Sequence, residues 1–317
     1  MPHRSIRRAN PGKMTQGEPI AAEAISDQSA IGIRPSRATE SYEDKMSLYK
    51  GITRPIRKIV VGLVTPLAGS EVRVRRLRFG PLRGKNICIN FQTSPRTFLG
   101  INEPWIAELA KEYIKPGDVI YDIGAHVGYT SLLFAQVLKN TGAVYAFEIL
   151  KYTTDRFLKK TVEANEFRNI HIENVGLGVS EQTLSLSIGS TAMTSIYGSD
   201  EQKQLEICQV VPIDRYVQER KIPPPALVKI DIEGAETDCL RGGHQIFNQS
   251  KPVMLIEFHS LELLKDGYEL LRSWGYRLMI RGGIEVDDKF ISRLERFHQT
   301  VLCKYGPAQL QPARKSH

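Results

Sequence analysis

The sequence predicts an α/β fold: a doubly wound, mostly parallel sheet with helices on both faces. Short apolar runs alternate with amphipathic helical patterns from residue 119 onward. The first run, 119–123, leads into a turn that contains Gly124 and Gly128, and such a turn is typical of the ligand-binding edge of these sheets. The last two runs lack a helical crossover of ordinary length between them, so we expect them to pair antiparallel.

The elements follow one another regularly along the chain. Alternation over 71–92, with a Gly-Pro turn, predicts a β-hairpin, and Pro104 opens a helix over 105–114. Core strands are expected at 119–123, 143–148, 170–174, 226–232, 252–258, 276–280 and 300–305. Helices are expected at 129–139, 153–165, 236–248 and 261–274. Period-two patterns at 183–188 and 205–211 predict a β insertion over a sheet edge, and the polar loop 190–198 could act as a lid.

Composition bounds the class of protein. With 41% hydrophobic and 25% charged residues, the chain has the balance of a soluble globular protein. We find no apolar run of the roughly 18–20 residues that span a bilayer and no secretory h-region, so we expect a cytoplasmic protein. The four cysteines have no metal-binding spacing, and we interpret them as reduced thiols.

The net charge of +8 is concentrated near the N-terminus. Residues 1–90 hold 17 Lys and Arg against 7 Asp and Glu, so the remainder is slightly acidic and gives no sign of a nucleic-acid groove. Basic residues precede an apolar run within 54–64. This segment could contact a membrane surface, which would make the protein peripheral, or could pack on its own domain. The sequence does not predict an oligomeric state.

The first strand and its turn suggest a particular cofactor. Asp122 precedes the turn, and an acid there disfavours a pyrophosphate and favours a cationic or zwitterionic ligand such as S-adenosylmethionine. The turn also lacks the Gly-x-Gly-x-x-Gly spacing of an NAD-dependent oxidoreductase, which is the runner-up enzyme. Glu148 ends the second strand, where such folds place an acceptor for ribose hydroxyls. The alternative for Glu148 is a solvated strand end.

A second constellation follows the fourth strand. Lys229, Asp231 and Glu233 share one face of an extended chain, and clustered charges of this kind are natural in a cleft. A carboxylate could act as general base, as could Lys229 if burial lowered its pKa. A third interpretation is a salt-bridge network that caps the helix beginning near Glu236.

The end of the fifth strand adds neighbours to this constellation. Glu257 and His259 lie there, and the carboxyl ends of adjacent parallel strands meet at one edge of a sheet. Asp231 and Glu257 are therefore candidate ligands of a divalent cation, and His259 is either a functional or a solvated strand-end histidine.

Three blocks of this sequence resemble the FkbM family of S-adenosylmethionine-dependent methyltransferases. They are residues 99–104 with 117–129, residues 146–148 with 163–165, and residues 228–236 with 240–243 and 251–259. The resemblance implies a class I methyltransferase fold with a seven-stranded sheet. It also implies methyl transfer to a hydroxyl of a sugar, glycan, polyketide or similar metabolite, so the expected partner is a small-molecule or glycan acceptor.

The resemblance also assigns roles by position. Asp122, Gly124 and Gly128 would line the methionine end of the cofactor, within a turn that includes Ala125 and His126. Glu148 would bind the ribose, and Asn174 and Val175 would lie by the adenine. Asp231 and Glu233, with Lys229 and His259 as further catalytic candidates, would face the transfer site. His126 stands where the family most often has Asn.

These assignments give a mechanism and a division of the chain. Asp231 is expected to take the acceptor's hydroxyl proton. Residues 1–42 would be a disordered basic tail, 43–98 a helical and β-hairpin extension, 99–306 the methyltransferase domain and 307–317 a C-terminal tail. The alternative from another class is a catalytically silent binding module that contacts a partner or membrane through the basic N-terminal region.

Overall fold

The computed structural model describes residues 71–90, 97, 102–188, 194–195 and 204–306. The predicted tails at 1–42 and 307–317 lie outside this range, as do the helical pieces within 43–67 and the surface segment 54–64. Most of the proposed lid, 190–198, also lies outside it. Within the described part of the chain, no helix is long and apolar enough to cross a membrane. All four cysteines are free and buried.

The main sheet has eight strands, in the order β13-β12-β14-β11-β10-β3-β4-β5. Five neighbouring strands are parallel: β5 (Ile170–Glu173), β4 (Ala143–Phe147), β3 (Val119–Ile123), β10 (Leu227–Ile230) and β11 (Val253–Phe258). The antiparallel partners are β14 (Gln299–Tyr305), β12 (Tyr276–Ile280) and β13 (Ile284–Glu285). The seven predicted strands are therefore confirmed, and β13 adds a short edge strand.

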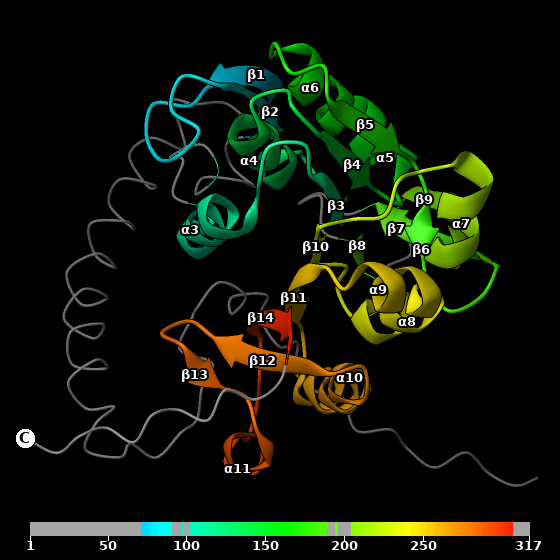
Figure 1. The fold of residues 1–317 in the computed structure, drawn as a ribbon. Coiled ribbons are helices and arrows are strands. Elements are labelled where there is room, and N and C mark those ends of the chain that lie inside the picture. Colours follow the sequence, from blue (N-terminus) through cyan, green and yellow to red (C-terminus); the bar gives the residue numbers. More distant parts are fainter. Residues whose placement is uncertain (1–70, 91–96, 98–101, 189–193, 196–203, 307–317) are drawn as a thin grey trace, which may run out of the picture.

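Helices cover both faces of this sheet (Figure 1). They are α3 (Pro104–Tyr113), α4 (Tyr129–Leu138), α5 (Lys151–Thr153), η1 (Thr154–Leu158), α6 (Lys159–Glu163), α7 (Ile213–Arg220), α8 (Glu236–Gly242), α9 (His244–Ser250), α10 (Leu261–Ser273) and α11 (Asp288–Ile291). Alternate strand residues supply the two cores. Ile120 packs in the core that holds α3 and α4, and Tyr121 packs in the core that holds α7 to α10.

Two helical predictions need correction. The helix expected over 236–248 is two helices, α8 and α9, that meet at Gly243. A Cβ on the neighbouring Gly242 would lie 1.9 Å from the backbone oxygen of Gly178, so the close approach of another backbone requires glycine there, at the cost of helix propensity. The sequence analysis predicted no element at 213–220, where the structure has α7. This helix buries only Ile213 and Val217, one turn apart, so its apolar pattern in the sequence is weak.

Two smaller sheets lie beside the main sheet in the described part of the chain. The insertion forms a separate sheet of β6 (Gly176–Leu177), β7 (Gln182–Ile188), β8 (Thr194–Ser195) and β9 (Gln204–Val211). The predicted hairpin is β1 (Val72–Arg76) paired with β2 (Asn86–Asn90). Its Ile87 and Ile89 are fully buried in the α3–α4 core, and the Cys88 N–H donates to the Thr161 hydroxyl at 2.9 Å. The hairpin is therefore packed into the domain.

The chain order reverses between β3 and β10, and this reversal places the turn after β3 against the end of β10. Gly124 in that turn has a φ of +81°, a left-handed conformation that favours glycine. A Cβ at this position would lie 1.8 Å from the carbonyl oxygen of Asp231. Gly124 therefore allows the two strand ends, and the residues that follow them, to lie in direct contact.

We predict that Gly124→Ala destabilises the fold through both strain and overlap. A left-handed alanine costs about 1–2 kcal/mol, and relief of the backbone overlap adds about 1–3 kcal/mol. The matched control is Gly282→Ala, because Gly282 has a φ of +91° and no atom within 4 Å of its added Cβ. Urea denaturation should show about 1–2 kcal/mol for the control and clearly more for Gly124→Ala. Equal losses of unfolding free energy in the two variants would show that the overlap with the Asp231 backbone does not destabilise Gly124→Ala.

Candidate active site

Glu148 follows β4 and is buried, with 7% of its surface exposed. Its Oε2 accepts the backbone N–H of His126 at 2.9 Å, and its Oε1 accepts that of Leu150 at 3.0 Å. Burial raises its pKa to about 7, although the two backbone donors oppose the shift. The alternative of a solvated strand end is therefore wrong for Glu148.

The backbone amides of the turn after β3 are already used within the protein. Gly124 and Ala125 donate to the Phe147 oxygen at 3.0 and 2.9 Å, and Gly128 donates to the Ala125 oxygen at 2.8 Å. The N–H of His126 is bound to Glu148. These four amides are therefore bonded within the protein and are not free to bind a ligand. What the turn does offer is Nε2 of His126, which is buried without a hydrogen-bond partner.

The loop after β5 lies beside the end of β4. The side-chain amide of Asn174 donates to the backbone oxygens of Glu148, at 2.8 Å, and of Ile149, at 3.2 Å. Val175, next to it, is buried. The structure thus brings Asn174 and Val175 to the strand end that carries Glu148, whereas the contact of this loop with an adenine remains a prediction.

Asp122 is fully buried, and its carboxylate is bonded within the protein. It accepts the hydroxyls of Thr130 and Ser131 in the first turn of α4. The ammonium of Lys229 lies 3.8 Å from its Oδ1. The carboxylate therefore holds α4 against β3 and β10, and its place at the methionine end of the cofactor stays a prediction.

Lys229 is buried between acids of the two strand ends. Its Nζ lies 3.1 Å from Oδ2 of Asp231 and 3.4 Å from the Gly124 oxygen. Burial alone would lower the pKa of Lys229, but Asp231 and Asp122 together raise it well above the ordinary value. The interpretation of Lys229 as a general base with a lowered pKa is therefore wrong. In return, and against the effect of burial, Lys229 lowers the pKa of Asp231.

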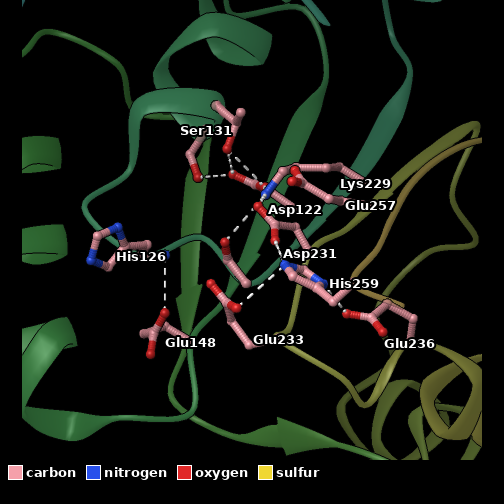
Figure 2. Close-up of polar contacts among 12 residues, drawn as sticks. Asp122, His126, Ser131, Glu148, Lys229, Asp231, Glu233, Glu236, Glu257 and His259 are labelled. Carbon is pink, nitrogen blue, oxygen red and sulfur yellow. Dashed lines mark hydrogen bonds and ion pairs between the residues drawn. The ribbon is translucent and has the colours of Figure 1, made fainter. Parts of the chain in front are cut away.

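His259, which follows β11, connects three acids that lie after β10 and at the start of α8 (Figure 2). Its Nδ1 lies 2.8 Å from Oε1 of Glu236, and its Nε2 lies 3.3 Å from Glu233 and 3.6 Å from Asp231. Burial lowers the pKa of His259, but the bond to Glu236 and the other acids outweigh it and raise the pKa to about 9. His259 is thus an imidazolium at neutral pH. The salt-bridge network expected near Glu236 exists, and it includes the candidate catalytic residues.

Two residues of this cluster were missing from the sequence analysis. Glu103 precedes α3, and its carboxylate lies within 4.8 Å of those of Asp231 and Glu257. Burial raises its pKa to about 8. His298 lies just before β14, with its Nε2 3.1 Å from Oε1 of Glu257. Its position beside β11 follows from the strand register, which the sequence does not show.

Left-handed backbone conformations also occur at this site. Seven described residues other than glycine have a positive φ, and three of them lie here: Glu103, His126 and Glu233, at 43°, 50° and 54°. The other four, Lys139, Asn140, Lys221 and Lys251, lie at or just after the C-terminal ends of helices. Such conformations are unfavourable for these side chains and concentrate at functional sites. Each of the three carries a polar group of the cluster or of the turn, which is consistent with a site whose geometry is fixed by its surroundings.

Residues 122–278 match the family described as Methyltransferase FkbM domain. This matched region, just under half of the chain, is similar to the FkbM methyltransferase domain. A similar curated protein is the hexuronic acid methyltransferase AglP of Haloferax volcanii, 25% identical over 166 residues. The match covers 52% of this chain and 66% of that protein, just under two thirds.

Solved structures of methyltransferases are also similar to this chain. One is the methyltransferase FkbM from Methylobacillus flagellatus KT, with 18% identity, 68% of this chain and 53% of that chain covered, and a TM-score of 0.40. Another is the precorrin-6y C5,15-methyltransferase of Geobacter metallireducens GS-15, with 12% identity, 64% and 88% covered, and a TM-score of 0.40. The strand order described above is that of the class I methyltransferase fold.

We predict that Lys229→Met strongly destabilises the protein, because it leaves Asp122 and Asp231 without their shared buried cation. Removing one partner of a buried ion pair costs about 3–5 kcal/mol. The control is Lys265→Met on the exposed side of α10, which should change the free energy of unfolding by no more than about 0.5 kcal/mol. Urea denaturation measures both, and similar small losses would mean that the two acids do not need Lys229.

Proposed function

We propose that this protein is an S-adenosylmethionine-dependent methyltransferase that methylates a hydroxyl oxygen of a sugar, glycan, polyketide or similar metabolite. The observation that carries the proposal is the position of the turn after β3. Its Gly124 N–H donates to Phe147, next to Glu148, and its Cα packs against the Asp231 backbone. Glu148, which we propose binds the ribose, and Asp231, which we propose takes the proton, thus lie on either side of one turn.

The residues at the ends of β3, β4 and β5 fit the cofactor. Glu148 would accept hydrogen bonds from the ribose hydroxyls, and the loop at Asn174 and Val175 would lie by the adenine. The buried Nε2 of His126 has no hydrogen-bond partner among the described residues and could bond to the ligand. When bound, S-adenosylmethionine supplies an electrophilic methyl group on a sulfonium sulfur.

The residues at the end of β10 fit the acceptor. The side chain of Asp231 is 23% exposed and that of Glu233 is 45% exposed, so both can be reached from solvent. Lys229 keeps Asp231 ionised, so that Asp231 can accept a hydrogen bond from the acceptor hydroxyl and take its proton. Positioning of that oxygen in line with the methyl group would contribute most of the acceleration.

The relative from Haloferax volcanii supports a sugar as the acceptor, since by its name it methylates hexuronic acid. The arrangement of acids also bears on the alternative of a catalytically silent module. A module that only bound a partner would have no need of Asp231 and Glu233 beside the cofactor turn, whereas hydroxyl methylation uses such carboxylates. This observation favours the enzyme.

We predict that the affinity for S-adenosylhomocysteine rises with pH because of Glu148. Its pKa is about 7 in the free protein. Ribose hydroxyls donate to the ionised form, so protonation competes with binding. Affinity should fall by up to about tenfold per unit below pH 7 and level off above it. Calorimetric titration from about pH 6 to about pH 8 measures this dependence.

The control for this prediction is Glu148→Gln, which cannot titrate. It should bind more weakly than the native protein at about pH 8 and should lose the part of the pH dependence that Glu148 causes. If the native protein and Glu148→Gln showed the same pH profile, Glu148 would not be the ribose acceptor. If the native protein did not bind at all, the methyltransferase proposal itself would fail.

We predict that Asp231→Asn lowers methyl transfer by about 10²–10⁴-fold, the usual contribution of a positioned acid or base. Binding of S-adenosylhomocysteine should change by less than about threefold, because the cofactor contacts lie at other strand ends. Turnover is measured with tritiated S-adenosylmethionine on the hexose or uronic acid that the native protein methylates in a panel. The control is Asp238→Asn on the exposed face of α8. Unchanged turnover in Asp231→Asn would rule out this role.

A further inference from the structure

Three carboxylates from separate elements meet at the acceptor side of the site. Glu103 stands at the start of α3, Asp231 follows β10, and Glu257 lies in β11. One oxygen of each lies within 4.8 Å of those of the other two. Carboxylates repel one another at this separation unless a cation or a proton lies between them.

The groups around these carboxylates compensate only part of their charge. Lys229 lies 3.1 Å from Asp231, and His298 lies 3.1 Å from Glu257. His259 is shared among Glu236, Glu233 and Asp231, and its closest contact, at 2.8 Å, is to the fully buried Glu236. If a bound cation held all three carboxylates ionised, they and the ammonium of Lys229 would together carry a net charge of −2, which a divalent cation would balance.

An independent observation comes from Glu103. Its Oε2 is buried and accepts no hydrogen bond from any residue that the structure describes. Buried polar atoms are nearly always bonded, so an oxygen left without a donor next to two other carboxylates requires an explanation. A bound cation gives one, because it would supply the missing partner of this oxygen and the common partner of all three carboxylates.

We infer that Glu103, Asp231 and Glu257 form a binding site for a hard divalent cation such as Mg²⁺ or Mn²⁺. Carboxylate oxygens are the ligands these cations prefer, and two or three protein ligands leave positions for water or substrate oxygens. His298 would orient Glu257, and Lys229 would orient Asp231, as hydrogen-bonding groups outside a metal commonly orient its ligands. The geometry gives Glu103 a function that the family resemblance does not.

This cation site also limits the chemical class of the methyl acceptor, an inference that rests on the proposed function. A cation beside Asp231 has open positions for two adjacent oxygens of one molecule. The acceptor class that fits is a sugar with neighbouring hydroxyls, or with a hydroxyl next to a carboxylate as in a uronic acid. The cation would bind the acceptor oxygen and make its proton easier to lose to Asp231.

The test is a titration of the full-length, chelator-treated protein with Mn²⁺, followed by the loss of the electron paramagnetic resonance signal of free Mn²⁺. We expect one Mn²⁺ per chain, displaced by excess Mg²⁺. Glu103→Gln and Glu257→Gln should each weaken binding at least tenfold. The control is Glu108→Gln, an exposed acid on the same helix α3, which should leave binding unchanged.

A second measurement guards against misfolded variants and separates this proposal from the proposed function. Mn²⁺ should raise the Tm of the native protein and of Glu108→Gln but not of Glu103→Gln, and all three should still bind S-adenosylhomocysteine. No Mn²⁺ binding to the native protein, or equal binding to Glu103→Gln, would overturn the inference. The inference would also be overturned if Glu103→Gln lost S-adenosylhomocysteine binding while the native protein bound no Mn²⁺, because Glu103 would then contact the cofactor instead.

Discussion

The buried ammonium of Lys229 is the interaction on which the site depends. It lies between Asp122, which is bonded to the first turn of α4, and Asp231, which faces the acceptor side. Burying an unpaired charge costs far more than a pair returns, so this buried ammonium needs the two acids, and in turn it lowers the pKa of Asp231. One side chain on β10 therefore stabilises both the helix that follows the cofactor turn and the carboxylate proposed to act on the acceptor.

The two halves of the site are consequently coupled through short, rigid connections. The turn after β3 is bonded to the end of β4 through Phe147 and Glu148, and it packs against the backbone of Asp231. No flexible linker separates the proposed ribose acceptor from the proposed proton acceptor. In a reaction whose rate depends on aligning a methyl group with an oxygen, such rigidity favours catalysis, because the alignment is present before the substrates bind.

The sequence predicted the core strands well because each combines an apolar run with a glycine or proline boundary. It also predicted that Glu148 and Asp231 lie at one edge of the sheet, because parallel strands end at a common edge. It could not show which way a strand-end acid points: Asp122 turns inward to Thr130 and Ser131, whereas Asp231 remains accessible. Nor could it find Glu103 or His298, since their contacts with Glu257 depend on how distant elements pack. The prediction of a lowered pKa for Lys229 was wrong because it considered burial without Asp231 and Asp122, which raise that pKa.

The region that matches the family model, residues 122–278, is shorter than the part of the chain that packs into one fold. Strand β14, which follows the matched region, lies between β11 and β12 in the middle of the sheet. The hairpin and α3, which precede it, share one apolar core with α4. A fragment cut at the family borders would retain the cofactor motif but lose an internal strand and the cover of one face. The region matched by the family and the region that folds cooperatively thus have different ends. Deletion variants should be cut at the ends of the region that folds cooperatively.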